Sequence, residues 1–443
     1  MRPRLPLLLV LLAVTPLACG DDGGAPPDAA APDAPLAATA DWTRDVLDTR
    51  LAIDLLSREA TATITLAASA SHGASFEIGD LELASVTDGD GAALPFVDNG
   101  DTVDVGVATT DEATLVFAYT FRYHDGFQGA DDNPALTLTW PYYCGNLFPC
   151  KTHDNPADGT AFALELTGVP ETKVAIYPHE IAAASPPYML AWAIAAYTEL
   201  DLGTTTAGTH VKMWYQPNQL NAATAGGAHL RDSFDWFEQT LGPYLFGDTV
   251  GSVSATWGFG AYGGMEHHPF WHVGSTALGD EEVNVHEAAH GWFGNGVRLR
   301  CWEDFTLSEG TVTYLAARAL TVTGGPVLAQ SIWDAYAARL QGLRDDGGGG
   351  VAWPDSCGAV DILDLFSDTP YTKGAYFYRA VANHVGVDAL DAALSAFYMR
   401  YRGEAAGMQD MLDTIEAETG WDPTACATKW LRTAEVPADL ECP

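Results

Sequence analysis

The chain has 443 residues, of which 47% are hydrophobic and 18% charged, and its formal net charge at pH 7 is −38. This length and apolar content are sufficient for more than one hydrophobic core, which indicates a globular protein of two domains. The acidity argues against nucleic acid as a partner, because phosphate binding needs basic patches and the sequence shows none.

The N-terminus has the pattern of an export signal. Arg2 and Arg4 precede an apolar run, 5–17, that is too short to span a bilayer, and Ala18-Cys19 follows at the place of a cleavage site. We interpret residues 1–19 as a lipoprotein-type signal peptide, with a lipid on Cys19 as the only attachment to a membrane of a bacterial cell. Because Pro16 and Leu17 depart from the usual residues before such a cysteine, secretion or a periplasmic location stays open as the alternative.

Residues 20–40 are rich in Ala, Pro, Asp and Gly, and they have too little apolar bulk to offset the entropy of ordering. We expect them to form a flexible tether. Six cysteines follow it, an even number that fits an oxidising compartment. Pairing of sequence neighbours, one of several possible connectivities, would join Cys144 with Cys150, Cys301 with Cys357, and Cys426 with Cys442.

Residues 41–225 carry the pattern of β-strands. The runs 61–66, 113–119 and 161–166 alternate or are briefly apolar, and Gly, Asp and Asn turns separate them. Helical periodicity begins at 229–237 and returns near 325–343, 373–385, 389–401 and 408–419. The predicted fold class is therefore α+β multidomain, with an N-terminal antiparallel β saddle or sandwich at 41–225 and a mainly helical domain at 226–443.

The strongest chemical signal is the segment His286-Glu287-Ala288-Ala289-His290. Residues four apart on a helix face the same way, so both imidazoles can bind one metal ion with Glu287 beside them as a base. A catalytic zinc normally has three protein ligands and one water, so a further ligand is required. Glu309, 19 positions after His290 and in the first turn of a second expected helix, is the candidate.

These motifs resemble the zinc aminopeptidases of the aminopeptidase N and leukotriene A4 hydrolase type, gluzincins whose signature is HExxH, eighteen residues and Glu. The segments 286–295, 302–304 and 307–310 carry the resemblance, together with Phe148-Pro149-Cys150. It implies a thermolysin-like catalytic domain with one Zn²⁺ per chain. Larger members continue into a helical domain that roofs the active site, so the end of this sequence at Pro443 implies a short form without that domain.

Two further segments match motifs of the family. The segment 263–267 resembles the exopeptidase motif whose glutamate holds the free α-amino group of the substrate, although His267 stands where the best-known members have Asn. The segment 370–375 resembles the Tyr-x-Lys-Gly motif whose tyrosine stabilises the oxyanion. The implied roles are catalytic for Glu287 and Tyr371; substrate-binding for Gly263, Gly264, Met265, Glu266 and His267; and metal-binding for His286, His290 and Glu309.

Other polar residues near these motifs allow two interpretations. His267, His268 and His272 would form a second metal site only with Glu266 as carboxylate, so we favour a role in lining the pocket. Glu303 and Asp304 are either orienting partners of the zinc histidines or solvated acids beside a helix.

The expected function is that of a zinc-dependent aminopeptidase, in which zinc-activated water attacks the first peptide bond and Glu287 takes its proton. Peptides are the expected partners. An endopeptidase with an open cleft stays as one alternative, because the roofing domain is not expected here. A non-catalytic peptide-binding surface lipoprotein is the other, and the retention of Glu287, Tyr371 and three metal ligands argues against it. The sequence gives no expectation for side-chain preference or oligomeric state.

Overall fold

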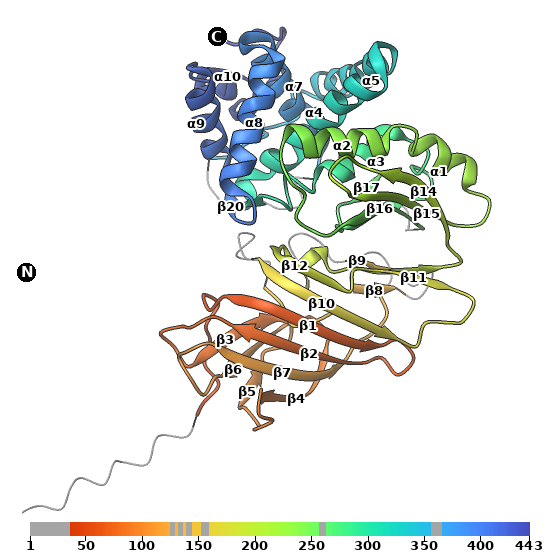
Figure 1. The fold of residues 1–443 in the computed structure, drawn as a ribbon. Helices are drawn as coiled ribbons and strands as arrows, with labels where there is room; N and C mark the ends of the chain where they lie inside the picture. The colour runs from red at the N-terminus through yellow and green to blue at the C-terminus, as the bar shows by residue number, and fades with distance from the viewer. Residues whose placement is uncertain are drawn as a thin grey trace, which may run out of the picture. The chain divides into compact units, whose positions relative to one another are not determined.

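The computed structural model describes residues 36–124, 129–131, 136–138, 144–151, 159–256, 263–355 and 366–443. Strands make up the first half of this part and helices most of the second half (Figure 1), which confirms the predicted α+β class. The chain from Leu36 to Pro443 is one compact unit. The signal at 1–19, with Cys19, and residues 20–35 of the tether lie outside the described residues. None of the helices in the described ranges is long and apolar enough to cross a membrane.

In the described part, the N-terminal strands form a six-stranded sheet of order β12-β10-β1-β2-β7-β4, a three-stranded sheet β3-β6-β5 and a four-stranded sheet β11-β13-β9-β8. Neighbours are antiparallel except for the parallel pair β1 and β10. The strands are β1 (Val46–Asp54), β2 (Glu59–Leu66), β3 (Gly73–Glu77), β4 (Glu82–Asp88), β5 (Phe96–Asp98), β6 (Thr102–Gly106), β7 (Ala113–Thr120), β8 (Gly129–Asp131), β9 (Leu136–Leu138), β10 (Thr160–Thr167), β11 (Val174–Ile176), β12 (Glu180–Ser185) and β13 (Ala193–Ala195).

The alternating pattern of β2 explains how these sheets pack. Ala60, Ala62, Ile64 and Leu66 are buried, while the residues between them are partly exposed. The buried face belongs to a core that also contains Phe76 of β3 and Phe117 of β7, whose rings meet edge to face with centroids 5.2 Å apart. The six- and three-stranded sheets therefore share one core, as expected for a sandwich.

A five-stranded mixed sheet leads into the second half. Its order is β14-β15-β16-β18-β17, with the three central strands parallel and the outer pairs antiparallel. The strands are β14 (Thr198–Thr204), β15 (His210–Tyr215), β16 (Thr249–Ala255), β17 (Gly264–Met265) and β18 (Phe270–Gly274). The sheet starts at Thr198, ahead of residue 226, where we placed the start of the catalytic domain. Val211 and Met213 of β15 belong to the same core as the helices.

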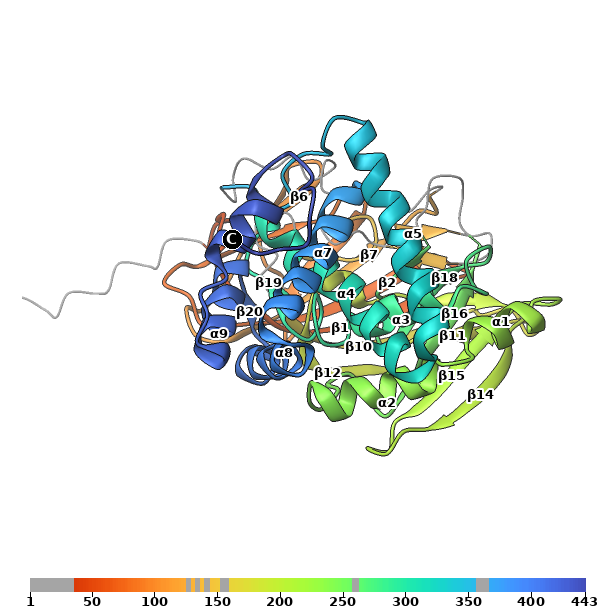
Figure 2. The same ribbon diagram turned by 90° about the horizontal axis from the view of Figure 1, so that it is seen from above.

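The helices are α1 (Leu220–Gly226), α2 (Leu230–Thr240), α3 (Glu281–Ala289), α4 (Phe305–Thr323), α5 (Gly325–Asp345), α7 (Asp368–Val385), α8 (Val387–Tyr401), α9 (Met408–Thr419) and α10 (Thr424–Ala427), with 3₁₀ turns η1 (Pro187–Met189) and η2 (Trp302–Asp304) and a π-helical turn η3 (Thr428–Arg432). Helix α4, buried along most of its length, lies against α3, α5 and α7 (Figure 2). The predicted helices match α2, α5, α8 and α9 closely, whereas α7 starts earlier than expected, at Asp368.

Covalent and polar links tie distant segments together. The disulfides Cys144–Cys150 and Cys426–Cys442 confirm two of the three predicted pairings. Cys301 is disulfide-bonded as well, and its predicted partner Cys357 lies outside the described residues. Two short strands, β19 (Arg298–Leu299) and β20 (Ala405–Ala406), pair in parallel. The buried Arg298 donates to the carbonyls of Ala184 at 2.9 Å and Gly403 at 3.0 Å.

Candidate active site

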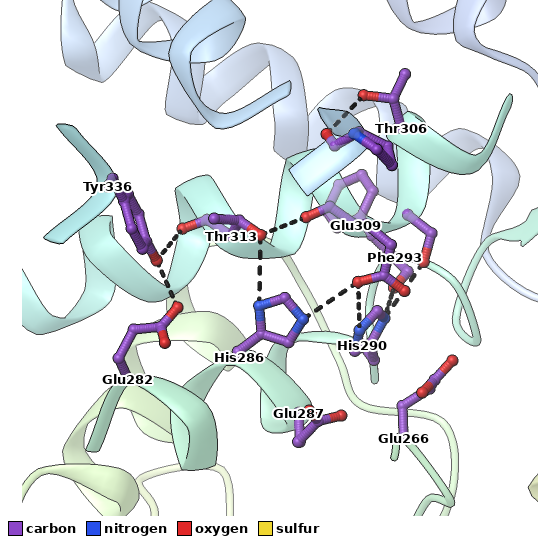
Figure 3. A network of polar contacts seen from close by, with 12 residues as sticks. Glu266, Glu282, His286, Glu287, His290, Phe293, Thr306, Glu309, Thr313 and Tyr336 are labelled. Carbon is purple, nitrogen blue, oxygen red and sulfur yellow. Dashed lines mark hydrogen bonds and ion pairs between the residues drawn. The ribbon is translucent and has the colours of Figure 1, made fainter. Parts of the chain in front are cut away.

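Helices α3 and α4 bring the three predicted metal ligands together. Helix α3 is capped at its N-terminus by Asp280, whose carboxylate accepts a hydrogen bond from the Glu282 amide. His286 lies on its last turn, His290 follows at its C-cap, and Glu309 lies on the second turn of α4. Glu309 Oε2 is 3.2 Å from His286 Nε2 and 3.4 Å from His290 Nε2 (Figure 3). One ligand atom from each residue lies within 4.8 Å of the others.

The opposite nitrogen of each imidazole is held by the surrounding helices. His290 Nδ1 lies 3.0 Å from the Phe293 carbonyl and 3.3 Å from Ser308 Oγ, and His286 Nδ1 lies 3.5 Å from Thr313 Oγ1. Since the carbonyl can only accept, it fixes a proton of His290 on Nδ1 and makes Nε2, which faces Glu309, the nitrogen that can bind a metal. This donor set of two imidazole nitrogens and one carboxylate fits zinc.

Sequence reasoning missed these orienting partners. Asp304 accepts hydrogen bonds from the Met408 amide at 2.8 Å and the Trp353 indole at 3.2 Å. It therefore does not orient a zinc-binding histidine. Burial raises the pKa of Asp304 to about 6. In the described residues neither Glu303 nor Asp304 hydrogen-bonds to the histidines. The sequence could have indicated Thr313 as a neighbour of the metal ligands, because it lies four residues after Glu309 and therefore on the same helix face.

Gly294 allows the chain to turn back immediately after His290. Its φ is +101°, and a Cβ there would lie 2.4 Å from Ser308 Oγ and 2.8 Å from His290 Nδ1. Both the left-handed backbone and the lack of space therefore require glycine at this position.

The three ligands line one wall of a cavity of about 230 Å³. Predicted site residues that share the cavity are Gly263, Gly264, Met265, Glu266, Glu287 and Tyr371; the wall is completed by Glu282, Val283, Thr313, Arg339, Phe366, Ser367 and Asp368. His267 is not a lining residue: it is buried behind the wall, with Nδ1 3.0 Å from His272 Nδ1.

Glu287 lies against the edge strand β17. A Cβ on Gly264 would come within 2.4 Å of Glu287 Oε1, so the glycine lets the backbone of the strand approach the carboxylate. Glu287, Glu266 and Glu309 are only 5%, 7% and 5% exposed. Burial raises the pKa of Glu287 well above its ordinary value, against the lowering effect of His290, and Glu266 and Glu309 raise it further.

Glu309 and His290 shift each other's pKa. Burial alone would raise the pKa of Glu309, but His290 and His286 lower it to about 2. Burial would likewise lower the pKa of His290, but Glu309 and Glu266 raise it to about 10. Three buried carboxylates in one cavity call for nearby positive charge, which a divalent cation at the cluster would supply. The charges, like the donor atoms, fit a bound zinc ion.

Glu266 is positioned by two residues that the sequence did not single out. The Tyr188 hydroxyl, on η1, lies 2.8 Å from Glu266 Oε1 and 2.7 Å from Asn295 Oδ1, and its single proton can serve one of these acceptors at a time. Asn295 Nδ2 donates to the Glu266 carbonyl at 2.7 Å. No spacing in the sequence signals a contact between residues as distant as Tyr188 and Glu266.

Helix α7 places Tyr371 beside the metal ligands. Its ring stacks on His286, with centroids 6.1 Å apart and planes 20° apart. Close packing of α7 on α4 makes this possible, because a Cβ on Gly374 would lie 2.5 Å from the Gly310 Cα. Lys373 of the same motif has a different role: it donates to the carbonyls of Gly350, at 3.0 Å, and Thr433.

The two other histidines near the cavity support it from behind. His268 bridges the Tyr244 hydroxyl, 2.7 Å from Nδ1, and the Glu287 carbonyl, 2.8 Å from Nε2. Burial lowers the pKa of both His268 and His272 to about 3, so both stay neutral. In the described part, neither joins a group of ligand-type side chains within metal-binding distance.

Comparison with known proteins agrees with this geometry. Residues 274–430 match the peptidase family M1 domain. The chain is 25% identical to leucine aminopeptidase 2 of Neurospora crassa over 346 residues, which are 71% of this chain and 49% of the relative. It is 28% identical to mouse aminopeptidase B over 244 residues, 52% of this chain and 36% of the relative. The chain thus spans about half or less of the length of these relatives.

Solved structures show the same fold. The M1 zinc metallopeptidase of Deinococcus radiodurans superposes with a TM-score of 0.74 at 19% identity, covering 89% of this chain and 94% of that one. A mutant of that peptidase bound to a Tyr-Ser-Ala substrate gives a TM-score of 0.75 at 19% identity, covering 90% and 96%. Residues 274–430 thus carry a peptidase family M1 domain, and the chain shares its fold with M1 zinc metallopeptidases and resembles aminopeptidases in sequence.

Proposed function

We propose that the protein is a zinc-dependent aminopeptidase that hydrolyses the first peptide bond of peptides. One observation carries this proposal: the buried Glu266 carboxylate lies in the same cavity as the cluster of His286, His290 and Glu309 (Figure 3). A free α-amino group is the substrate feature that such a carboxylate would bind, and a peptide without one brings no cation to this buried charge. The names of the curated relatives support the proposal.

Each side chain has a defined task in this reaction. His286, His290 and Glu309 would hold the zinc ion, which would supply a water of lowered pKa and a Lewis acid for the carbonyl. Glu287 takes the proton of the attacking water and returns it to the leaving amine. The Tyr371 hydroxyl donates to the carbonyl oxygen as negative charge develops on it. Glu266 holds the ammonium group of the substrate and so determines that the first peptide bond is the one cut.

Paired peptides that differ only in N-acetylation test this proposal on the zinc-loaded protein. We expect cleavage of the free peptides alone, and a loss of about 10²- to 10⁴-fold in kcat for Glu287→Gln with zinc binding retained. Equal cleavage of free and acetylated peptides would replace the aminopeptidase with an endopeptidase. Zinc binding with no turnover of any peptide would favour a peptide-binding protein.

We also propose one zinc ion per chain. The second group of ligand-type side chains in the cavity, Glu266, Glu287 and His290, shares His290 with the first, so the two cannot be filled independently. Elemental analysis of the purified protein and of Glu309→Gln measures the stoichiometry.

We propose, finally, that the protein is exported and anchored by a lipid on Cys19. The disulfides of the described part support an oxidising compartment. Mass spectrometry of the mature N-terminus tests this, with Cys19→Ser expected to release the protein from the membrane fraction. A mature N-terminus without lipid would favour ordinary secretion.

A further inference from the structure

The cavity extends beyond the residues used in the proposed reaction. Glu282 lies one helical turn before His286 on α3, and its Oε1 is 2.6 Å from the Tyr336 hydroxyl of α5. The same hydroxyl lies 3.1 Å from the Thr313 carbonyl. Figure 3 shows this pair on the opposite side of the histidines from Glu266. A substrate held by Glu266 at its amino end would therefore extend towards Glu282.

Arg339 lines this far end of the cavity. It is exposed on α5, one turn after Tyr336, and its guanidinium carbon lies 5.6 Å from the centre of the Tyr336 ring. Across the described ranges Arg339 forms no ion pair, whereas Arg318 and Arg432 pair with Asp391 and Asp355. The other charged side chains of the wall are carboxylates and the two metal-binding histidines. The cavity thus has a carboxylate at each end, Glu266 at one and Glu282 at the other, and its permanent cation, Arg339, lies at the Glu282 end.

The distance between the two ends can be estimated from α3, because Glu266 has a ligand atom within 4.8 Å of one on His290, and Glu282 marks the other end. Glu282 and His290 are eight residues apart, which on a helix is about 12 Å. An extended peptide covers about 3.3–3.6 Å per residue, so this span holds about three residues. A short peptide bound at Glu266 would bring its C-terminal carboxylate near Glu282 and Arg339.

We propose that Arg339 binds the C-terminal carboxylate of short substrates, so that the enzyme prefers peptides of two to four residues with a free carboxylate. A guanidinium can donate two parallel hydrogen bonds to a carboxylate. The ring of Tyr336 supports the guanidinium from one side. This inference rests on the proposed aminopeptidase function and adds a substrate class to it.

The groove beyond Arg339 is acidic and therefore disfavours the C-terminal carboxylate of a longer peptide. A second groove of about 510 Å³ adjoins the cavity and shares Glu282 and Arg339 with it. Its walls carry the carboxylates of Asp280, Glu281 and Glu282, of which Asp280 caps α3 and Glu281 lies 2.5 Å from His229. A longer peptide would pass over Arg339 into this groove and lose the carboxylate contact.

The experiment compares trialanine with its C-terminal amide on the zinc-loaded full-length protein. We expect kcat/KM to favour the acid by about tenfold, the order of a charge-assisted hydrogen bond, through KM because the contact is remote from the reacting bond. Arg339→Met should bring the acid-to-amide ratio close to one, and Arg339→Lys should restore part of it. Arg344→Met, which removes the same charge from the same helix outside the cavity, should keep the wild-type ratio.

Two further measurements separate the possible failures. Calorimetric binding of acid and amide to Glu287→Gln should show the same preference without turnover. In hexaalanine and its amide the ratio should approach one. A wild-type ratio near one for trialanine, or a tenfold ratio that survives in Arg339→Met, would overturn the inference and leave the aminopeptidase intact. Failure to cleave or bind any peptide would overturn the proposed function and this inference with it.

Discussion

Thr313 connects the two helices that carry the metal ligands. Its hydroxyl donates to the Glu309 carbonyl at 2.7 Å, and its oxygen lies 3.5 Å from His286 Nδ1. Loss of such a partner typically lowers metal affinity by about 10- to 100-fold. We therefore expect Thr313→Val to bind zinc more weakly by that factor in competition with a chromophoric chelator.

Thr311→Val is the matched control, because its hydroxyl donates to the Tyr378 hydroxyl and not to a ligand. Both threonines are buried on α4, so the loss of folding stability is comparable. Unchanged zinc affinity in Thr313→Val would remove Thr313 from the metal site.

Tyr188 gives a second prediction at the residue scale. Tyr188→Phe removes the hydroxyl between Glu266 and Asn295, and leaving buried acceptors without a donor costs about 1–3 kcal/mol of folding stability. We expect urea denaturation to show this loss and KM for free peptides to rise, because Glu266 is held less firmly. Tyr197→Phe, which loses one bond to the Ser254 carbonyl, should lower stability without changing KM.

Among elements, the crossing of α4 and α7 determines where Tyr371 lies. A Cβ on Gly310 would lie 2.7 Å from the Gly374 Cα, so Gly310→Ala must push the helices apart. We expect a destabilisation of about 1–3 kcal/mol and a fall in kcat, because Tyr371 lies one turn from Gly374. Thermal unfolding and turnover measure both effects.

Gly342→Ala on α5 provides the control for this prediction. A Cβ there has no atom within 4 Å among the described residues, and alanine favours a helix over glycine by about 0.5–1 kcal/mol. This variant should be as stable as the wild type or more so. Equal behaviour of the two variants would show that the crossing tolerates a methyl group.

At the scale of the whole molecule, zinc contributes to stability as well as to chemistry. Without a cation the buried carboxylates of Glu266, Glu287 and Glu309 repel one another. Ligand binding to the folded state alone adds about 4 kcal/mol when the ligand is at a thousand times its Kd. We expect chelation to lower Tm, zinc to restore it, and Glu309→Gln to respond less. A Tm that is insensitive to chelators in the wild type would contradict the proposed metal site.

The sequence predicted what depends on local periodicity and on motif resemblance. The helix pattern placed His286 and His290 on one face, and the resemblance named Glu309, which the structure brings beside them. Glu282 could have been found by the same rule, since it stands four residues before His286. Tyr188 and Arg339 could not, because their place at the cavity comes from the packing of η1 and α5 and no periodicity encodes it.

The pairing of strands into sheets was equally hard to predict from the sequence. The alternation in β2 predicted a half-buried strand, but nothing in β14 or β15 indicated that they would join the sheet next to the helices. Partner choice in a sheet depends on long-range packing. The class was therefore predictable and the start of the second core was not.

Arg298 also limits when the two halves of the protein can assemble during synthesis. Its buried guanidinium donates to the carbonyl of Ala184 and to that of Gly403, which the ribosome adds 219 positions later than Ala184. A nascent or truncated chain that stops before Gly403 lacks one acceptor for a charge that the native state buries. The β half and the helical half can therefore be joined as in the native structure only after Gly403 has been synthesised.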